Sequence, residues 1–142
     1  EVHIHRRSRT AAQLCVSDAD FDDLHATAAT GATIRGLNAT RVALQLPDEL
    51  LPAATRLYRR LRAHVGDDVL LYILGDTTFA ACCADEVAAQ HAHADLLLHY
   101  GPACLTAPTA RMPVRHVLPR NPLDVPRCIG ALAALRDCAL AA

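Results

Sequence analysis

The stretch LGDTTFAACCADEV, residues 74–87, decides the fold because it joins a continuous apolar run to an alanine-rich segment. The apolar run, residues 69–74, predicts a strand buried on both faces of a sheet. The segment from about Ala81 to His93 predicts a helix. The neighbouring thiols Cys82 and Cys83 therefore lie at the start of this helix, where the connection from the strand leads into it. In an open parallel sheet such connections lie at the carboxyl edge of the strands, where ligands bind.

A second unit of the chain repeats this plan. The apolar run at residues 95–99 predicts a strand, and the sequence Tyr-Gly-Pro-Ala-Cys, residues 100–104, follows it. Because parallel strands end at the same edge of a sheet, we expect Cys82 and Cys104 to share that edge. Cys83 follows Cys82 on the predicted helix, about 100° further round its axis. We therefore expect Cys82 to face the site and Cys83 to pack inward.

Strands and helices alternate along the rest of the chain. Further strands are predicted at residues 41–46 and 114–118. Helices are predicted from Asp18, with Gly31 and Gly36 leading out, and along residues 50–65. This alternation predicts an α/β fold: a small parallel four-stranded sheet with right-handed crossovers and helices on both faces.

Two helices carry apolar stripes at helical spacing. The stripe of the helix after the first strand consists of Leu50, Ala54, Leu57, Tyr58, Leu61 and Val65. We interpret its arginine face, residues 56–62, as solvated, because no aromatic residue is interleaved with it. The last helix starts at Asp124, and its predicted buried stripe consists of Cys128, Ile129, Leu132 and Leu135.

Length and composition exclude several classes of protein. The 142 residues suit one domain, residues 1–142, in which residues 1–17 form either a short edge strand or a disordered arm. A net charge of −1 provides no field for binding nucleic acid. No apolar run approaches the roughly 20 residues of a membrane span, and no signal peptide is recognisable. Six irregularly spaced cysteines favour a reducing, cytoplasmic setting over a disulfide scaffold. The chain begins with Glu and its last helix runs to the final residue, so we expect a piece of a longer polypeptide.

Four interpretations compete at Cys82, Cys83 and Cys104. Free cysteines often pack as small apolar core residues. A structural zinc site prefers paired Cys-x-x-Cys elements, which the chain lacks. An iron–sulfur cluster takes thiolates from separate loops, and a helix start favours the thiolate form. A nucleophilic Cys83 with His99 as its base is the weakest interpretation, because no third member is identifiable. These residues alone leave core packing and metal binding open.

Three blocks of the chain resemble the diphthamide-biosynthesis family. They are VALQLPDELL at residues 42–51, GDTTFAACCADEVAA at residues 75–89 and HYGPACL at residues 99–105. Within the family, the segments DTT at residues 76–78, DEVAA at residues 85–89 and TARMP at residues 109–113 resemble the second of two eukaryotic subunits.

This resemblance implies a function and a cofactor. The family transfers the 3-amino-3-carboxypropyl group of S-adenosylmethionine to a histidine of translation elongation factor 2, using a 4Fe-4S cluster and radical chemistry. The chain then resembles the first of three α/β domains in the subunit that supports its paralogous partner, the first subunit, through electron transfer. Cys82 and Cys104 match two ligand positions, Cys83 is the alternative, and the third ligand comes from a later domain. No catalytic residue is assigned, and we expect the isolated chain to be inactive. The alternative is a non-catalytic docking domain with structural cysteines or a zinc site.

Overall fold

The computed structural model describes residues 16–75, 81–104, 106–107, 109–118, 120 and 124–140. Its centre is a four-stranded sheet in which every paired strand is parallel, in the order β2-β1-β3-β4. The strands are β1 (Arg41–Gln45), β2 (Leu70–Ile73), β3 (Leu96–Tyr100) and β4 (Val114–Val117). The α/β prediction is confirmed, and all strand ends agree with the expected ones to within one residue.

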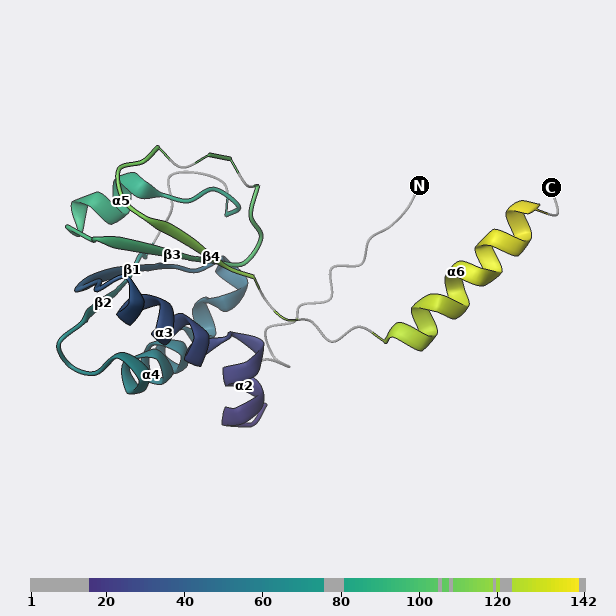
Figure 1. Ribbon diagram of the computed structural model, residues 1–142, viewed down its shortest axis with the longest axis horizontal. Coiled ribbons are helices and arrows are strands. Elements are labelled where there is room, and N and C mark those ends of the chain that lie inside the picture. Colours follow the sequence, from purple (N-terminus) through teal and green to yellow (C-terminus); the bar gives the residue numbers. More distant parts are fainter. Residues whose placement is uncertain are drawn as a thin grey trace.

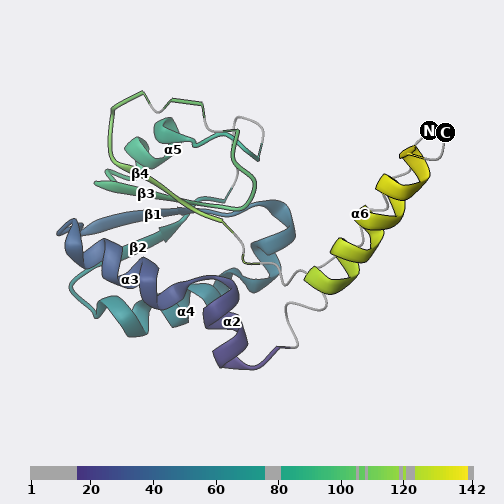
Figure 2. The ribbon, with the colours of Figure 1, turned by 45° about the vertical axis from the view of Figure 1, so that its right-hand side comes forward.

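Helices cover both faces of the sheet, as predicted (Figure 1). One face carries α2 (Asp18–Leu24), α3 (Thr27–Gly36), the 3₁₀ helix η1 (Asp48–Ala53) and α4 (Ala54–Val65), and the other carries α5 (Glu86–His91) (Figure 2). The sheet separates two hydrophobic cores, and alternate residues of β1 point into one or the other. Val42 and Leu44 belong to the larger core beneath α3 and α4, whereas Ala43 packs with Ala89 of α5.

The predicted apolar stripe lies in or against the larger core, but the single predicted helix is two elements, because Leu50 belongs to η1 and α4 begins only at Ala54. Leu57 and Leu61 are fully buried, and Tyr58 packs partly buried beside them. The arginine face of α4 is not simply solvated, however. Arg56 lies over the ring of Phe21, 4.3 Å from its centroid, and Arg60 pairs with Asp22. These contacts fasten α2 to α4, which is a tertiary effect that helical periodicity cannot reveal.

The predicted first helix is two helices with a break between them. Ser17 caps α2 through its side chain, and α2 is separated from α3 by His25 and Ala26, of which Ala26 has a φ of 49°. Gly31, expected to lead out of the helix, lies inside α3 instead. A Cβ added at Gly31 would lie 2.6 Å from the Cβ of His64. The glycine is therefore needed for the close approach of α3 to α4.

The expectation that residues 69–74 are buried on both faces is wrong. In the observed strand order β2 lies at one edge of the sheet, and Leu70 is 45% exposed. The central strands β1 and β3 are the ones buried on both faces. A continuous apolar run identifies a strand, but its position in the sheet depends on which strands pair with it.

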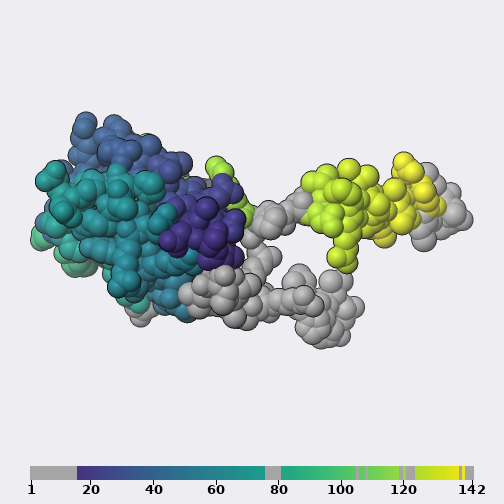
Figure 3. All heavy atoms as spheres, turned by 90° about the horizontal axis from the view of Figure 1, so that it is seen from below, coloured from purple at the N-terminus to yellow at the C-terminus, as the bar shows by residue number. Residues whose placement is uncertain are grey.

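The final helix, α6 (Val125–Leu140), is not packed as predicted. It lies apart from the sheet and its covering helices (Figures 1 and 3). Leu132 is 61% exposed, Ile129 and Leu135 are also exposed, and Cys128 is half-buried. Periodicity predicts which side of a helix is apolar but not what covers it. Within the described residues, α6 included, no helix has both the length and the apolar character needed to cross a membrane.

The predicted arm, residues 1–17, lies almost entirely outside the described residues. Of its last two residues, Val16 packs against the larger core and Ser17 caps α2. Its interpretation as an edge strand or a disordered arm therefore stays a prediction.

A matched pair of leucine substitutions tests this division between core and exposed helix. Leu98→Ala removes a fully buried side chain from β3 and should lower the free energy of unfolding by about 2–5 kcal/mol. Leu135→Ala on α6 should change it by less than about 0.5 kcal/mol, because that side chain is exposed. Urea unfolding followed by circular dichroism measures both. Equal losses for the two variants would contradict the exposed position of α6.

Candidate metal centre

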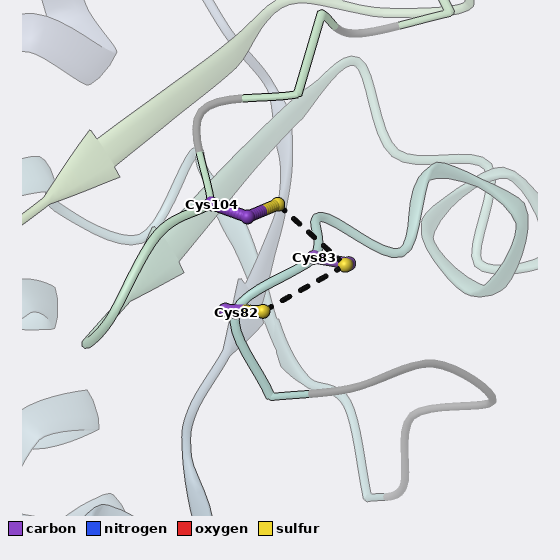
Figure 4. A group of neighbouring side chains, drawn as sticks. All are labelled: Cys82, Cys83 and Cys104. Carbon is purple, nitrogen blue, oxygen red and sulfur yellow. Dashed lines mark hydrogen bonds between the residues drawn. The ribbon is translucent and has the colours of Figure 1, made fainter.

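Three thiols from two loops converge at the carboxyl edge of the sheet. Cys82 and Cys83 lie in the turn that precedes α5, and Cys104 lies in the loop that follows β3. The Sγ atoms of Cys83 and Cys104 are 3.6 Å apart, and those of Cys82 and Cys83 are 3.9 Å apart (Figure 4). All three Sγ atoms lie within 4.8 Å of one another. We call this group the thiol triad.

The shared edge expected for Cys82 and Cys104 is confirmed. The backbone N–H of Cys104 donates a hydrogen bond to the carbonyl oxygen of Cys82 at 3.1 Å. The two loops are therefore joined through their main chains at the thiols themselves. All three side chains are free thiols in the structure, and Cys104 is the most exposed of them.

The expectation that Cys82 and Cys83 point in different directions is wrong. It assumed that the helix begins near Ala81, but α5 begins at Glu86 and residues 81–83 form a turn. Asp85 is the N-cap of α5, because its side chain accepts a hydrogen bond from the N–H of Ala88 at 2.8 Å. That capping aspartate was the sequence signal for the later start. Without a helix at residues 82–83, both thiols can turn toward Cys104.

A buried amide lies beneath the turn that carries the two neighbouring cysteines. Gln45, the last residue of β1, donates a hydrogen bond from Nε2 to the carbonyl oxygen of Cys83 at 2.8 Å. Its Oε1 accepts a hydrogen bond from the N–H of Asp85 at 2.9 Å. The sequence pattern predicts Gln45 only as a residue of the first strand. Its distance of 38 positions from Cys83 offers no local pattern that would connect the two.

A buried carboxylate holds the segment that follows the Cys104 loop. Glu86 accepts hydrogen bonds from the N–H of Thr109 at 2.6 Å, from its hydroxyl at 2.7 Å and from the N–H of Arg111 at 3.2 Å. Burial acts to raise the pKa of Glu86, but these donors outweigh it and the net pKa lies below the usual value. Glu86 therefore connects the first turn of α5 to the segment leading into β4.

The loop that carries Cys104 begins with a glycine that its conformation requires. Gly101 has a φ of 103°, in the region that side chains other than glycine rarely adopt. A Cβ at this position would also lie 2.8 Å from Cγ of Pro47. Gly101 thus allows the chain to leave β3 closely past the end of β1 and to bring Cys104 over the turn.

The surroundings of the thiols give them different acidities. Hydrogen bonds donated by the hydroxyl and the N–H of Thr106 stabilise the Cys104 thiolate and lower its pKa to about 7. Hydrogen bonding with Cys104 and Cys82 raises the pKa of Cys83 to about 11. The expected lowering by a helix start is wrong for Cys83, because that residue lies three positions before Glu86, the first residue of α5. The triad thus holds one readily ionised thiol beside a protonated donor.

His99 does not serve as a base for Cys83 in this structure. Its ring is fully buried, and Nε2 donates a hydrogen bond to the carbonyl oxygen of Pro102 at 3.0 Å. Burial lowers the pKa of His99. The neighbouring ring of His116 packs edge-on to it, with centroids 5.2 Å apart. The contacts of His99 are thus those of a core residue, which disfavours the nucleophile interpretation.

The fold and the triad together define a class: a parallel α/β domain that presents three thiols at the carboxyl edge of its sheet. The family model described as "Putative diphthamide synthesis protein" matches residues 46–139 of the chain. The chain belongs to this diphthamide-synthesis family and is of its second-subunit type.

Several relatives carry the name 2-(3-amino-3-carboxypropyl)histidine synthase subunit 2. The Gallus gallus protein is 45% identical over 109 residues, covering 77% of this chain and 22% of its own length. The Homo sapiens protein is 37% identical over 115 residues, covering 81% of this chain and 23% of its own length. The chain therefore spans less than a quarter of these two relatives.

The fold is also similar to that of a solved structure. The crystal structure of Dph2 from Pyrococcus horikoshii matches with a TM-score of 0.63 and 19% identity, covering 78% of this chain and 32% of that chain. A crystal structure of the same protein with a 4Fe-4S cluster matches with a TM-score of 0.61. At this level of identity, the similarity shows the fold alone.

Replacing Glu86 by Gln tests the connection between α5 and the segment after Cys104. The amide keeps the volume but offers one acceptor oxygen in place of two, so we expect a loss of about 1–3 kcal/mol in the free energy of unfolding at neutral pH. The folded-state pKa of Glu86 is lowered, so its contribution is present above the unfolded value of about 4.3 and is lost as pH falls through the folded pKa. The free energies of unfolding of Glu86→Gln and of the unmodified chain should therefore converge as the pH falls. Urea unfolding of both proteins across the acidic range measures this.

The matched control is Asp67→Asn, which removes an exposed carboxylate after α4. That variant should unfold like the unmodified chain at neutral pH. Parallel pH profiles for Glu86→Gln and the unmodified chain would show that the buried carboxylate does not stabilise the fold through its charge.

Proposed function

We propose that this chain forms part of the 4Fe-4S cluster site in subunit 2 of a 2-(3-amino-3-carboxypropyl)histidine synthase. The observation that carries the proposal is the convergence of Cys82, Cys83 and Cys104, whose Sγ atoms lie within 4.8 Å of one another. The triad lies in two of the three blocks that resemble the family, residues 75–89 and 99–105. The Pyrococcus horikoshii protein with a 4Fe-4S cluster shares this fold, which is consistent with the proposal.

The donor set fits an iron–sulfur cluster. Thiolates are the ligands that such clusters take, and they are commonly supplied by separate loops. Here the thiols come from two loops, and Cys104 ionises readily because Thr106 donates to its sulfur. In a cluster each thiolate would bind its own iron, so the Sγ of Cys104 and that of its partner in the turn would lie further apart than in the structure, where they are within 4.8 Å of each other. The cysteines lie in a turn and a loop rather than in a strand, which leaves room for that adjustment.

We propose Cys82 and Cys104 as ligands, with Cys83 as the alternative to Cys82. The Sγ of Cys83 contacts both other sulfurs, so either neighbour in the turn can supply a thiolate beside Cys104. The third ligand would come from a later domain of the longer subunit, of which this chain would be the first α/β domain. The exposure of Cys104 is consistent with a site that such a domain covers.

The proposed reaction transfers the 3-amino-3-carboxypropyl group of S-adenosylmethionine to a histidine of translation elongation factor 2. The cluster, when bound, supplies one-electron chemistry. The paralogous first subunit would be the partner in a heterodimer, with the present chain in the supporting, electron-transferring subunit. A reducing compartment such as the cytoplasm would keep the three thiols available.

This chain's own residues have defined parts in such a site. Thr106 favours the thiolate of Cys104, and Glu86 holds the segment that returns to β4. The bond from the N–H of Cys104 to the carbonyl oxygen of Cys82 keeps the two loops in contact. No catalytic group of the chain is required in this role.

A zinc ion in a non-catalytic docking domain is a second candidate, favoured by the sulfur spacing. Two thiolates bound to one tetrahedral zinc at about 2.3 Å lie about 3.8 Å apart. The separations of 3.6 and 3.9 Å in the triad are close to that value. Three cysteines would leave the fourth position to a water molecule or to a ligand from elsewhere.

Serine substitutions in a full-length relative test the cluster proposal. Residues 41–139, which include Cys128, would replace the corresponding segment of the Gallus gallus subunit 2, produced anaerobically with the first subunit. We expect Cys82→Ser and Cys104→Ser to remove most of the subunit's iron and sulfide, because a hydroxyl is a poor substitute for a thiolate. Cys128→Ser, in α6, is the matched control and should retain both. Iron and sulfide assays and modification of the elongation factor provide the measurements.

The outcomes separate the ligand assignments. Loss of iron with Cys83→Ser but not with Cys82→Ser would transfer the ligand role to Cys83. Retention of iron with Cys104→Ser would exclude the shared-edge site. Stoichiometric zinc in place of iron in the unsubstituted chimera would favour the docking domain instead.

The isolated chain should form no stable cluster and show no transferase activity. The triad is partly solvent-exposed, and the proposed third ligand lies in another domain. Anaerobic titration with iron and sulfide, followed by absorption spectroscopy and gel filtration, measures this. A stable visible chromophore that co-elutes with the 142-residue chain would contradict the need for a later domain.

A further inference from the structure

The strand order places β1 directly between the strands that lead to the thiols. β2 precedes the Cys82–Cys83 turn, β3 precedes Cys104, and both pair with β1. The two loops therefore meet over the end of β1. The last residue of β1 is Gln45, and its side chain is only 1% exposed.

The carboxamide of Gln45 hydrogen-bonds at two points to the segment between Cys83 and Asp85. Its Nε2 donates to the carbonyl oxygen of Cys83 at 2.8 Å, and its Oε1 accepts from the N–H of Asp85 at 2.9 Å. Both partners are main-chain groups of a segment that belongs to no helix or strand. Removing the carboxamide would leave buried polar groups without these bonds, which is costly in a region excluded from water.

These two bonds are not required to begin α5. Asp85 already caps that helix, because its own side chain accepts from the N–H of Ala88. The hydrogen bonds of Gln45 lie just before the helix in sequence, and they fix the backbone geometry between Cys83 and Asp85. The carbonyl oxygen of Cys82, one residue further back, accepts from the N–H of Cys104 at 3.1 Å. The turn is therefore hydrogen-bonded to β1 at Cys83 and Asp85 and to the Cys104 loop at the adjacent residue, Cys82.

We propose that Gln45 is a positioning residue for the thiol triad. Its carboxamide holds the Cys82–Cys83 turn in the orientation that brings Cys83 within 3.6 Å of Cys104. Without it the turn can rotate away from the Cys104 loop while the sheet and helices stay folded. The consequence for metal binding rests on the function proposed above, whereas the thiol geometry can be measured without any metal.

The test replaces Gln45 in the 142-residue chain by Met, which is similar in length but has no amide. Gln90→Met is the matched control, because Gln90 is exposed and its carboxamide accepts a hydrogen bond from the Arg111 side chain, outside the Cys82–Cys83 turn. Leu61→Ala is the control for lost stability alone, because Leu61 lies in the larger core on the other face of the sheet. Gln45→Asn, which is one methylene too short to reach both partners, replaces Gln45→Met if that variant does not fold.

Two readouts report on the triad directly. The first is the yield of Cys83–Cys104 bridging by dibromobimane, resolved from other adducts by peptide mapping. The second is hydrogen exchange at the N–H of Cys104, compared with the global free energy of unfolding from urea titration. We expect Gln45→Met to lower the bridging yield several-fold. It should also accelerate exchange at Cys104 about tenfold beyond the global change, which corresponds to about 1.4 kcal/mol. Both controls should leave the bridging yield unchanged.

The proposal would be overturned if Gln45→Met left the bridging yield unchanged and altered the Cys104 exchange rate only as far as global stability changes, which is the result expected for Leu61→Ala. Titration with Co²⁺, followed through its thiolate absorption bands, tests separately whether the triad binds a metal. If the unmodified chain binds Co²⁺, Gln45→Met should weaken the affinity about tenfold. Failure of the unmodified chain to bind Co²⁺ would count against the metal site, and the bridging and exchange results would still decide the role of Gln45.

Discussion

The site depends on one constraint of the sheet, the position of β1 between the two strands that lead to the thiols. β2 and β3 both pair in parallel with β1, so all three strands end at the same edge. Cys82 and Cys104 are 22 positions apart in sequence, yet their main chains are hydrogen-bonded. Any strand order that separated β2 from β3 more widely would move the two loops apart. The central strand therefore acts as both spacer and support for the triad.

Buried polar groups hold the loops at an otherwise apolar edge. Gln45 and Glu86 are both buried, and each bonds to main-chain groups far along the chain. Their partners lie in irregular segments, where no strand or helix would satisfy the backbone. These bonds also connect the family-like blocks, because Gln45 comes from the first, Cys83 from the second and Thr109 from the segment typical of the second subunit. The segments that resemble the family are therefore hydrogen-bonded to one another in the fold.

The sheet is well packed, whereas the apolar side chains of the terminal helix α6 are exposed. β1 and β3 are enclosed by helices on both faces, whereas the apolar side chains of α6 are exposed. Both segments have apolar residues at the spacing typical of their secondary structure. The difference lies in the surroundings of each segment, because burial requires a partner surface and the stripe alone does not specify one.

The sequence by itself determined the α/β class, the four strands to within one residue, the apolar stripe of α4 and the common edge of Cys82 and Cys104. These features follow from local periodicity and from the rule that parallel strands end together. Only the tertiary structure decided that β2 is an edge strand, that α5 begins at Glu86 and that Cys83 joins the other two thiols. The physical reason is that strand pairing and buried hydrogen bonds join residues distant in sequence. The bond from Gln45 to Cys83 spans 38 positions, beyond the reach of any local pattern.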